Sequence, residues 1–180
     1  MSWFSTTLGG GDYALSATTV ATSVEMAASP GNTLQLVVGE IVGGSLRLGD
    51  RPAWSLNPGV VGGLSFSRAL WSSNGFFLLG TASASFSMSG TIAGPVRALD
   101  FRGGVAFGRS FGPVTPYLMA RGFGGPVTVP TAESGSTVVG DTRHFTVGLG
   151  VSARLGVFDV GGEAAPLGER RATATAGVSF

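Results

Sequence analysis

The sequence contains no cysteine and no lysine, and its only histidine is His144. Without cysteine the chain can form neither a disulfide framework nor a cysteine-based metal site. One histidine among singly scattered acidic residues also leaves no recognisable set of metal ligands, so we expect no metal and no cofactor. The formal net charge is +1, which gives no basic surface for nucleic acid. We therefore expect no nucleic-acid partner.

Charge is scarce throughout the chain. Charged residues make up 12% of the sequence and hydrophobic residues 43%, whereas an ordinary soluble domain carries about 25% charged residues. The high apolar content excludes a disordered chain. The surface of a soluble protein with so few charges would be poorly hydrated, so this composition favours a surface that contacts lipid.

A long hydrophobic run is missing as well. The longest charge-free stretch, residues 69–96, has the length of a membrane-spanning helix. It is interrupted by the polar segment 72–75 and by serines at every second position from Ser83 to Ser89. Its purely apolar run, residues 76–79, is far too short to span a bilayer. These features exclude a helical membrane protein.

The sequence does have a strong alternation with a period of two residues. From Phe76 to Met88 every second residue is Phe, Leu, Gly, Ala or Met, and the positions between them become Thr and Ser. Residues 145–155 alternate in the same way, with Phe145, Val147 and Leu149 on one face. This pattern is typical of strands with two different faces. The polar face is rich in Ser, Thr and Gly, which suits the crowded lumen of a narrow barrel.

Reading the alternation along residues 1–180 as a single domain predicts ten strands. Lipid permits only a closed sheet, because every backbone polar group needs a partner there. We therefore predict an all-β fold, a closed antiparallel up-and-down transmembrane β-barrel. Eight strands remain an alternative if residues 3–8 are a tail and residues 157–165 are miscounted. The predicted strands are residues 3–8, 12–28, 33–46, 57–70, 75–90, 97–110, 114–124, 141–156, 157–165 and 170–180.

The predicted connections alternate between short and long. Short turns are expected at residues 29–32, 72–75 and 111–113 and near Gly156, because these segments combine Gly with Pro, Ser or Asn. Longer links are expected at residues 43–53, 90–97, 124–141 and 166–169. Outer-membrane barrels likewise alternate short periplasmic turns with longer extracellular loops.

The last nine residues, ATATAGVSF, end in Phe180 and place Val178 and Ala176 at the second positions before it. This ending resembles the assembly signal of bacterial outer-membrane barrels, and the segment 111–117 is similar to the turn and strand opening of small OmpA-, OmpX- and OmpW-like barrels. The resemblance implies a monomer in the bacterial outer membrane, in contact with lipid and lipopolysaccharide and assembled by the barrel-insertion machinery. Since residues 1–12 lack a basic region followed by an apolar stretch, we expect a mature chain.

Several charged residues fall on the predicted lumen faces. Unpaired charges in a narrow lumen would be costly to desolvate, so we expect them to pair. They could form an ion-selective constriction or a salt-bridge plug, and we favour the plug. The predicted lumen charges are Asp100, Arg102, Arg121, Arg154, Asp159 and Glu163.

His144 is the only candidate for histidine-based catalysis. With Thr146 and the nearby Asp141 it supplies the residue types of a nucleophile, a base and an orienting acid. The sequence His144-Phe145-Thr146 is faintly similar to the His-x-Ser of barrel lipid A deacylases but carries Thr in place of Ser. We expect a histidine that lines the lumen and no enzymatic activity. The predicted function is a structural outer-membrane barrel or a narrow, porin-like passive pore. The alternatives are an enzyme acting on lipid A or peptide through His144, and a soluble lipocalin-like ligand-binding barrel.

Overall fold

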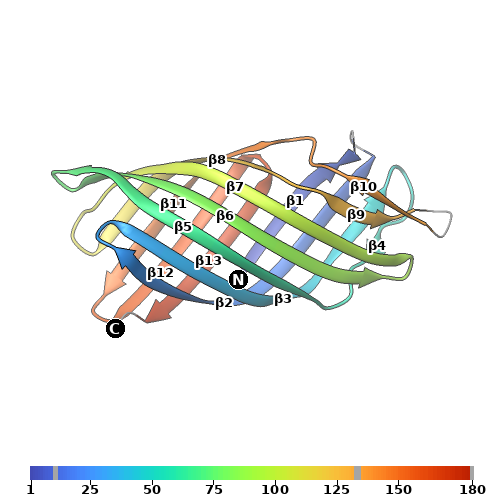
Figure 1. Ribbon diagram of the computed structural model, residues 1–180, viewed down its shortest axis with the longest axis horizontal. Helices are drawn as coiled ribbons and strands as arrows, with labels where there is room; N and C mark the ends of the chain where they lie inside the picture. The colour runs from blue at the N-terminus through green and yellow to red at the C-terminus, as the bar shows by residue number, and fades with distance from the viewer. Residues whose placement is uncertain (10–11, 132–134, 179–180) are drawn as a thin grey trace.

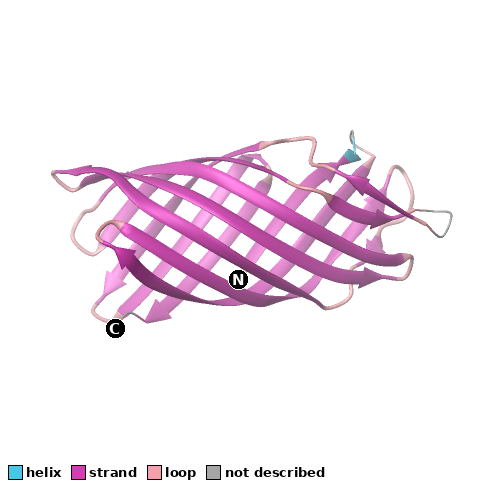
Figure 2. Ribbon diagram, in the orientation of Figure 1, coloured by secondary structure: helices cyan, strands magenta, loops and turns pink. Residues whose placement is uncertain are grey.

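The computed structural model describes residues 1–9, 12–131 and 135–178. Within these residues the chain is all-β and forms one antiparallel sheet (Figure 2). No helix among them is long and apolar enough to cross a membrane. The strands are β1 (Ser2–Leu8), β2 (Tyr13–Ser29), β3 (Asn32–Leu48), β4 (Trp54–Ser55), β5 (Gly59–Ser73), β6 (Phe76–Thr91), β7 (Gly94–Arg109), β8 (Val114–Gly124), β9 (Val127–Pro130), β10 (Ser136–Val139), β11 (Phe145–Leu155), β12 (Phe158–Gly168) and β13 (Arg170–Val178).

Ten of these strands form a closed ring (Figure 1). The order is β8, β7, β6, β5, β3, β2, β1, β13, β12 and β11, and β11 pairs with β8 to complete the circle. The first and last strands meet through antiparallel pairs that include Ser2 with Thr173 and Ser5 with Arg170. The prediction of ten antiparallel strands is confirmed, and the alternative of eight strands is wrong because β1 and β12 both belong to the ring.

The two ends of the ring differ. Residues 29–32, 73–76, 109–114 and 155–158 reverse the chain at one end, which we call the short-turn end and which lies at the left in Figure 1. Asn74 and Gly75 both have positive φ angles, 51° and 81°, as a type I′ hairpin turn requires. Residues 48–59 and 124–145 connect strands at the opposite end, which we call the long-loop end.

Two predicted long links are in fact short. β6 continues to Thr91 and β7 begins at Gly94, so only two residues separate them. The prediction of a link over residues 90–97 was wrong because Gly90 and Pro95 remain paired in the ladder. Similarly, a single residue, Glu169, separates β12 from β13.

The other two links contain structure that was not predicted. β3 runs on to Leu48 through the first part of the expected loop 43–53, and the short strand β4, directly after that loop, pairs with it at Ser45 and Leu46. In the expected loop 124–141, β9 pairs with β7 at Arg97 and Thr128. This register continues that of β8, whose Gly124 lies opposite Phe101 of β7. The β9–β10 hairpin therefore extends the wall of the ring at the long-loop end.

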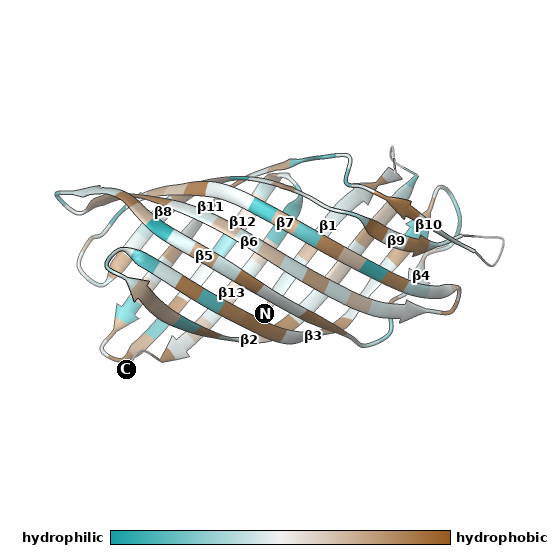
Figure 3. Cartoon of the chain, in the orientation of Figure 1, coloured by the Kyte–Doolittle hydropathy of each residue, from teal (hydrophilic) through white to brown (hydrophobic). Residues whose placement is uncertain are grey.

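The alternation seen in the sequence separates an outward face from an inward face. On β11, Leu149 is 58% exposed on the outward face, whereas the inward Thr146 is 1% exposed. The hydropathy of successive residues alternates along the strands (Figure 3). Val178 and Ala176, from the expected assembly signal, are exposed near the end of β13, and Phe180 lies outside the described residues.

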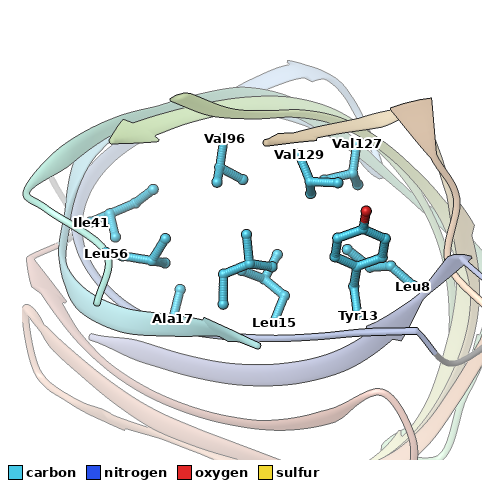
Figure 4. Packing of buried hydrophobic residues seen from close by; sticks show 10 residues of the cluster. Leu8, Tyr13, Leu15, Ala17, Ile41, Leu56, Val96, Val127 and Val129 are labelled. Carbon is cyan, nitrogen blue, oxygen red and sulfur yellow. The ribbon is translucent and has the colours of Figure 1, made fainter. Parts of the chain in front are cut away.

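The interior at the long-loop end is filled with apolar side chains. They come from β1, β2, β3, β7, β9 and the segment before β5, and they point toward one another across the ring (Figure 4). A uniformly polar lumen, as the sequence suggested, is therefore wrong for this end. We call this group the apolar cluster: Leu8, Tyr13, Leu15, Ala17, Ile41, Leu46, Leu56, Val96, Val127 and Val129.

Candidate functional site

A cavity of about 590 Å³ lies inside the ring. One end is bounded by members of the apolar cluster, including Leu15 and Ile41, and the lining extends toward the short-turn end as far as Glu25 and Ser152, which are both exposed. Hydroxyl-bearing strands and charged strands form its two walls. A space of this volume is in the range of small-molecule binding sites.

The hydroxyl wall consists of inward residues from β2, β3, β5 and β6. On β6, the alternation noted in the sequence directs Ser83, Ser85 and Ser87 into the cavity. Gln35 of β3 links the neighbouring strands, because its Nε2 donates to Ser23 Oγ at 3.1 Å and its Oε1 accepts from Ser65 Oγ at 3.0 Å. Apart from Glu25 of β2 near the short-turn end, this wall offers hydrogen bonds without charge.

The charged wall contains ion pairs in two partly buried clusters. In the first, Arg102 of β7 donates through both terminal nitrogens to Glu169, at 3.0 and 2.8 Å, and its Nε donates to Asp100. The Glu169 side chain is only 3% exposed. The Arg102 guanidinium also lies 5.1 Å from the centre of the Phe123 ring. Arg102 is therefore held by two carboxylates and an aromatic face.

Glu169 reaches this position because of the glycine before it. Gly168 has a φ of +85°, and a Cβ built on it would lie 1.7 Å from the Phe145 carbonyl oxygen. Only glycine fits such a close approach in this backbone conformation. The resulting tight reversal from β12 to β13 turns Glu169 into the interior, where the backbone carbonyl of Glu169 accepts from Thr146 Oγ1 at 3.3 Å.

The second ion pair joins β8 to β12. Arg121 donates to both oxygens of Glu163, at 3.1 and 2.9 Å, and the Tyr117 hydroxyl donates to Glu163 Oε1 at 2.9 Å. Two-pronged contacts of this kind between guanidinium and carboxylate are strong and fix the geometry of both groups. The structure thus brings four predicted lumen residues into interior ion pairs, namely Arg102 with Asp100 and Arg121 with Glu163, and Arg102 pairs in addition with Glu169.

The other predicted lumen charges lie elsewhere. Arg154 Nε donates to Asp159 Oδ1 at 2.8 Å, but the two side chains are 69% and 39% exposed. They sit beside the turn between β11 and β12 at the short-turn end. This pair is in contact with solvent and is not among the residues that line the cavity.

Two interior residues escaped the sequence analysis. Glu169 was assigned to a loop. Arg171 could have been found, since the alternation that puts Ala172 and Ala176 outward puts Arg171 inward. Arg171 is partly buried, and its one hydrogen bond among the described residues runs from Nε to Thr173 Oγ1 at 3.3 Å. It forms no ion pair with any described carboxylate.

The candidate catalytic residues are not assembled into a site. β11 begins at Phe145, so the predicted strand 141–156 starts too early and His144 lies exposed before the strand. Thr146 Oγ1 is engaged by the Glu169 carbonyl, and Asp141 Oδ1 accepts from Thr6 Oγ1 at 2.8 Å. No hydrogen bond joins His144, Thr146 and Asp141 in the described part of the chain. This geometry gives no support to histidine-based catalysis.

Asp141 lies outside the strands, in the segment between β10 and β11. Burial raises the pKa of its carboxyl, and the negative charges of Glu169 and Asp100 raise it further, against the Thr6 hydrogen bond and Arg102. A raised pKa in the folded state means that ionisation of Asp141 disfavours folding. The stability that Asp141 contributes is full below its unfolded-state pKa and is lost as the pH rises through its folded-state pKa.

We therefore expect Asp141→Asn to stabilise the protein relative to wild type at pH 8 and progressively less as the pH is lowered toward 4. The asparagine oxygen can still accept the hydrogen bond from Thr6 and carries no charge. The measurement is the urea midpoint of unfolding across this pH range. Asp50→Asn, at an exposed turn, is the matched control. Parallel pH profiles for Asp141→Asn and wild type would contradict the expectation.

No protein-family model, curated protein or solved structure matches this chain. Among residues 1–9, 12–131 and 135–178, no group of three or more His, Asp or Glu side chains is placed to hold a metal ion. The interior cavity and its two ion pairs are therefore the features on which a function can be argued.

Proposed function

We propose that this protein is an integral β-barrel of the bacterial outer membrane whose lumen is closed at the long-loop end. The observation that carries the proposal is the pattern of the outward face. Aromatic residues form two belts, one near the short turns and one further along the same strands. Phe76 and Phe86 belong to different belts and are ten positions apart on β6, and Phe101 and Phe111 are ten positions apart on β7 and the turn after it. A tilted membrane strand needs about 9–11 residues to cross the hydrocarbon layer.

The belts also include exposed aromatic residues from other strands. Trp71 and Phe158 lie near the short turns with Phe111, and Phe145 lies at the far end of β11. The guanidinium of Arg109 is 4.7 Å from the Phe76 ring centre and 5.0 Å from that of Phe111. Aromatic girdles with snorkelling arginines are typical of the interfaces of a membrane barrel.

Arg68 is an outward charge three residues from Trp71 and opposite Gly80 of β6, where its long side chain can reach the interface near the short turns. The other outward positions of the described strands between the belts carry no charge. Outward charges at the other end lie past the second belt: Glu40 is opposite Val60, Val60 is opposite Met88, and Met88 is opposite Arg97. Met88 comes two residues after Phe86. The apolar residues exposed between the belts include Val24, Leu36, Val38, Leu64, Phe66, Val105, Phe107, Leu118, Val147, Leu149, Val151 and Val160.

A soluble lipocalin-like barrel would need the opposite arrangement. Its large apolar side chains line the interior and its polar face meets water. In this chain Leu118 is 63% and Leu149 58% exposed, while Ser83 and Ser85 line the cavity. An apolar surface that encircles the molecule is far larger than the patches found on soluble monomers, which favours the membrane.

The closed lumen follows from the interior. The apolar cluster converges from several strands at the long-loop end, and Leu8, Leu46 and Val129 in it are 0% exposed. A hydrophobic constriction excludes water and ions. The ion pairs of Arg102 and Arg121 add a second obstruction beside the cavity. These features support a closed barrel over the passive pore that the sequence allowed.

We expect refolded wild-type protein to insert into lipid vesicles and to show no steady conductance in planar bilayers. Shortening the cluster with Leu8→Ala and Val129→Ala together should produce resolvable openings, because the constriction loses two fully buried side chains. Leu118→Ala, on the outward face, is the matched control and should remain silent. Recovery of the protein in the carbonate-soluble fraction after incubation with vesicles would overturn membrane insertion. Steady wild-type conductance equal to that of the double variant would overturn the closed lumen.

A further inference from the structure

Among the described arginines that line the cavity, Arg171 is the one that is not paired with a carboxylate. Arg171 of β13 has five N–H donors, of which only Nε–H has a partner within the described residues, in the hydrogen bond to Thr173 Oγ1. The Arg171 side chain is among those that line the cavity. A buried charge without a partner is costly, so a position of this kind is suited to an anion from outside the chain.

The neighbouring carboxylates are not available to Arg171. Both oxygens of Glu169 accept from Arg102, and both oxygens of Glu163 accept from Arg121. These two ion pairs flank Arg171 closely enough to act on it electrostatically. Because each glutamate is fixed in a two-pronged contact with another arginine, neither accepts a hydrogen bond from Arg171, which lines the cavity.

A second unsatisfied group lines the same cavity. Asp100 Oδ2 accepts from Arg102, whereas Asp100 Oδ1 is buried and has no hydrogen-bond partner within the described chain. A buried acceptor without a partner is unfavourable, and it would be satisfied by a ligand that donates a hydrogen bond. The hydroxyl wall, with Ser83, Ser85 and the Ser23–Gln35–Ser65 chain, offers further donors and acceptors to the same ligand.

We propose that the cavity binds a small organic anion that also carries hydroxyl groups, with its anionic group on Arg171 and its hydroxyls toward Asp100 Oδ1 and the hydroxyl wall. A carboxylate and a phosphate both match the planar donors of a guanidinium, so the shared chemistry is that of a sugar acid or a sugar phosphate. The volume of about 590 Å³ accommodates a molecule of monosaccharide size. The inference concerns the interior of the ring and goes beyond its placement in a bilayer.

The test is isothermal titration calorimetry of the folded wild-type protein in detergent micelles with four probes: gluconate, glucose 6-phosphate, glucose and acetate. We expect gluconate or glucose 6-phosphate to bind at least about tenfold more tightly than glucose, which lacks the charge, and than acetate, which lacks the hydroxyls. The tighter of the two anions identifies the anionic group. Binding of neither anion, or equal binding of glucose or acetate, would overturn the proposal.

Variants then locate the site. Arg171→Gln should weaken binding of the preferred anion at least about tenfold. Arg154→Gln, at the short-turn end and outside the cavity lining, should leave this binding unchanged. If Arg171→Gln does not fold, as judged by the heat-dependent gel mobility of a folded barrel, a second measurement uses the wild-type protein. This protein is labelled with ¹⁵N-arginine and titrated with the anion by NMR. The Nε resonance of a buried arginine should shift on titration with the anion and stay in place with glucose. Equal binding by Arg171→Gln and wild type, or unmoved resonances, would contradict the assignment to Arg171.

Discussion

Leu149→Arg should lower the free energy of unfolding of the protein in lipid bilayers by about 2–4 kcal/mol. Leu149 is 58% exposed on the outward face of β11, with Leu118 of β8 and Ala164 of β12 opposite it. It lies between the two aromatic belts, four residues from Phe145 and six from Leu155. An arginine there would place a charge in the middle of the proposed hydrocarbon contact. The measurement is equilibrium unfolding in urea of protein refolded into large vesicles.

Ser152→Arg is the control for Leu149→Arg. Ser152 lies on the same strand but on the inward face, where it lines the exposed part of the cavity. The new guanidinium would stay hydrated, so the free energy of unfolding should change little. If Ser152→Arg were the more harmful of the two, the assignment of the outward face to lipid would be wrong. If Leu149→Arg were equally tolerated in vesicles, the same conclusion would follow.

Glu169→Ala should destabilise the protein by about 3 kcal/mol, because removal of one member of a buried ion pair leaves the other charge without compensation. Arg102 would lose both contacts of its terminal nitrogens and keep Asp100 alone. The side chains of Arg102 and Glu169 are 16% and 3% exposed, so water can replace little of the loss. Chemical unfolding in detergent micelles measures the effect.

A double-mutant cycle tests whether the loss comes from the orphaned charge. Arg102→Ala combined with Glu169→Ala should be less destabilising than the sum of the two single changes. Arg154→Ala breaks the exposed ion pair with Asp159 and should have little effect, since exposed pairs contribute little. Additive single changes at Arg102 and Glu169 would show that the pair is not coupled.

Most of the ring could be predicted from alternation alone. In a strand with two different faces, the character of the side chains alternates from one residue to the next. This alternation by itself assigns Ser83 inward and Leu149 outward, and both assignments are correct. The β9–β10 hairpin was missed because VTVP, residues 127–130, is too short to show a period and contains a proline. At residues 90–97 the error was the opposite: glycine and proline suggested a loop, but β6 and β7 remain paired there.

The interior could be predicted less well, and the reasons are physical. Which charges pair depends on the register between strands, and bulges such as those between Thr18 and Thr19 or between Val147 and Leu149 shift that register. The pair of Arg102 with Glu169 joins residues 67 positions apart and could not be read from either segment. The apolar cluster was missed because apolar residues are expected on the outward face. The residue types of Leu15 and Ile41 therefore gave no sign that these side chains point inward.

The pairing of β1 with β13 determines when the ring can close during folding. Ser2 pairs with Thr173, so this contact joins residues at opposite ends of the chain, whereas most other neighbours in the ring are joined by hairpins. Contacts of large sequence separation form slowly, because the loop entropy is lost before the contact is made. Until β13 has been synthesised, β1 has an open edge that could pair with another chain. Closure of the ring should therefore be a late step that follows synthesis of β13, and the kinetics of β1–β13 pairing should limit the rate of assembly.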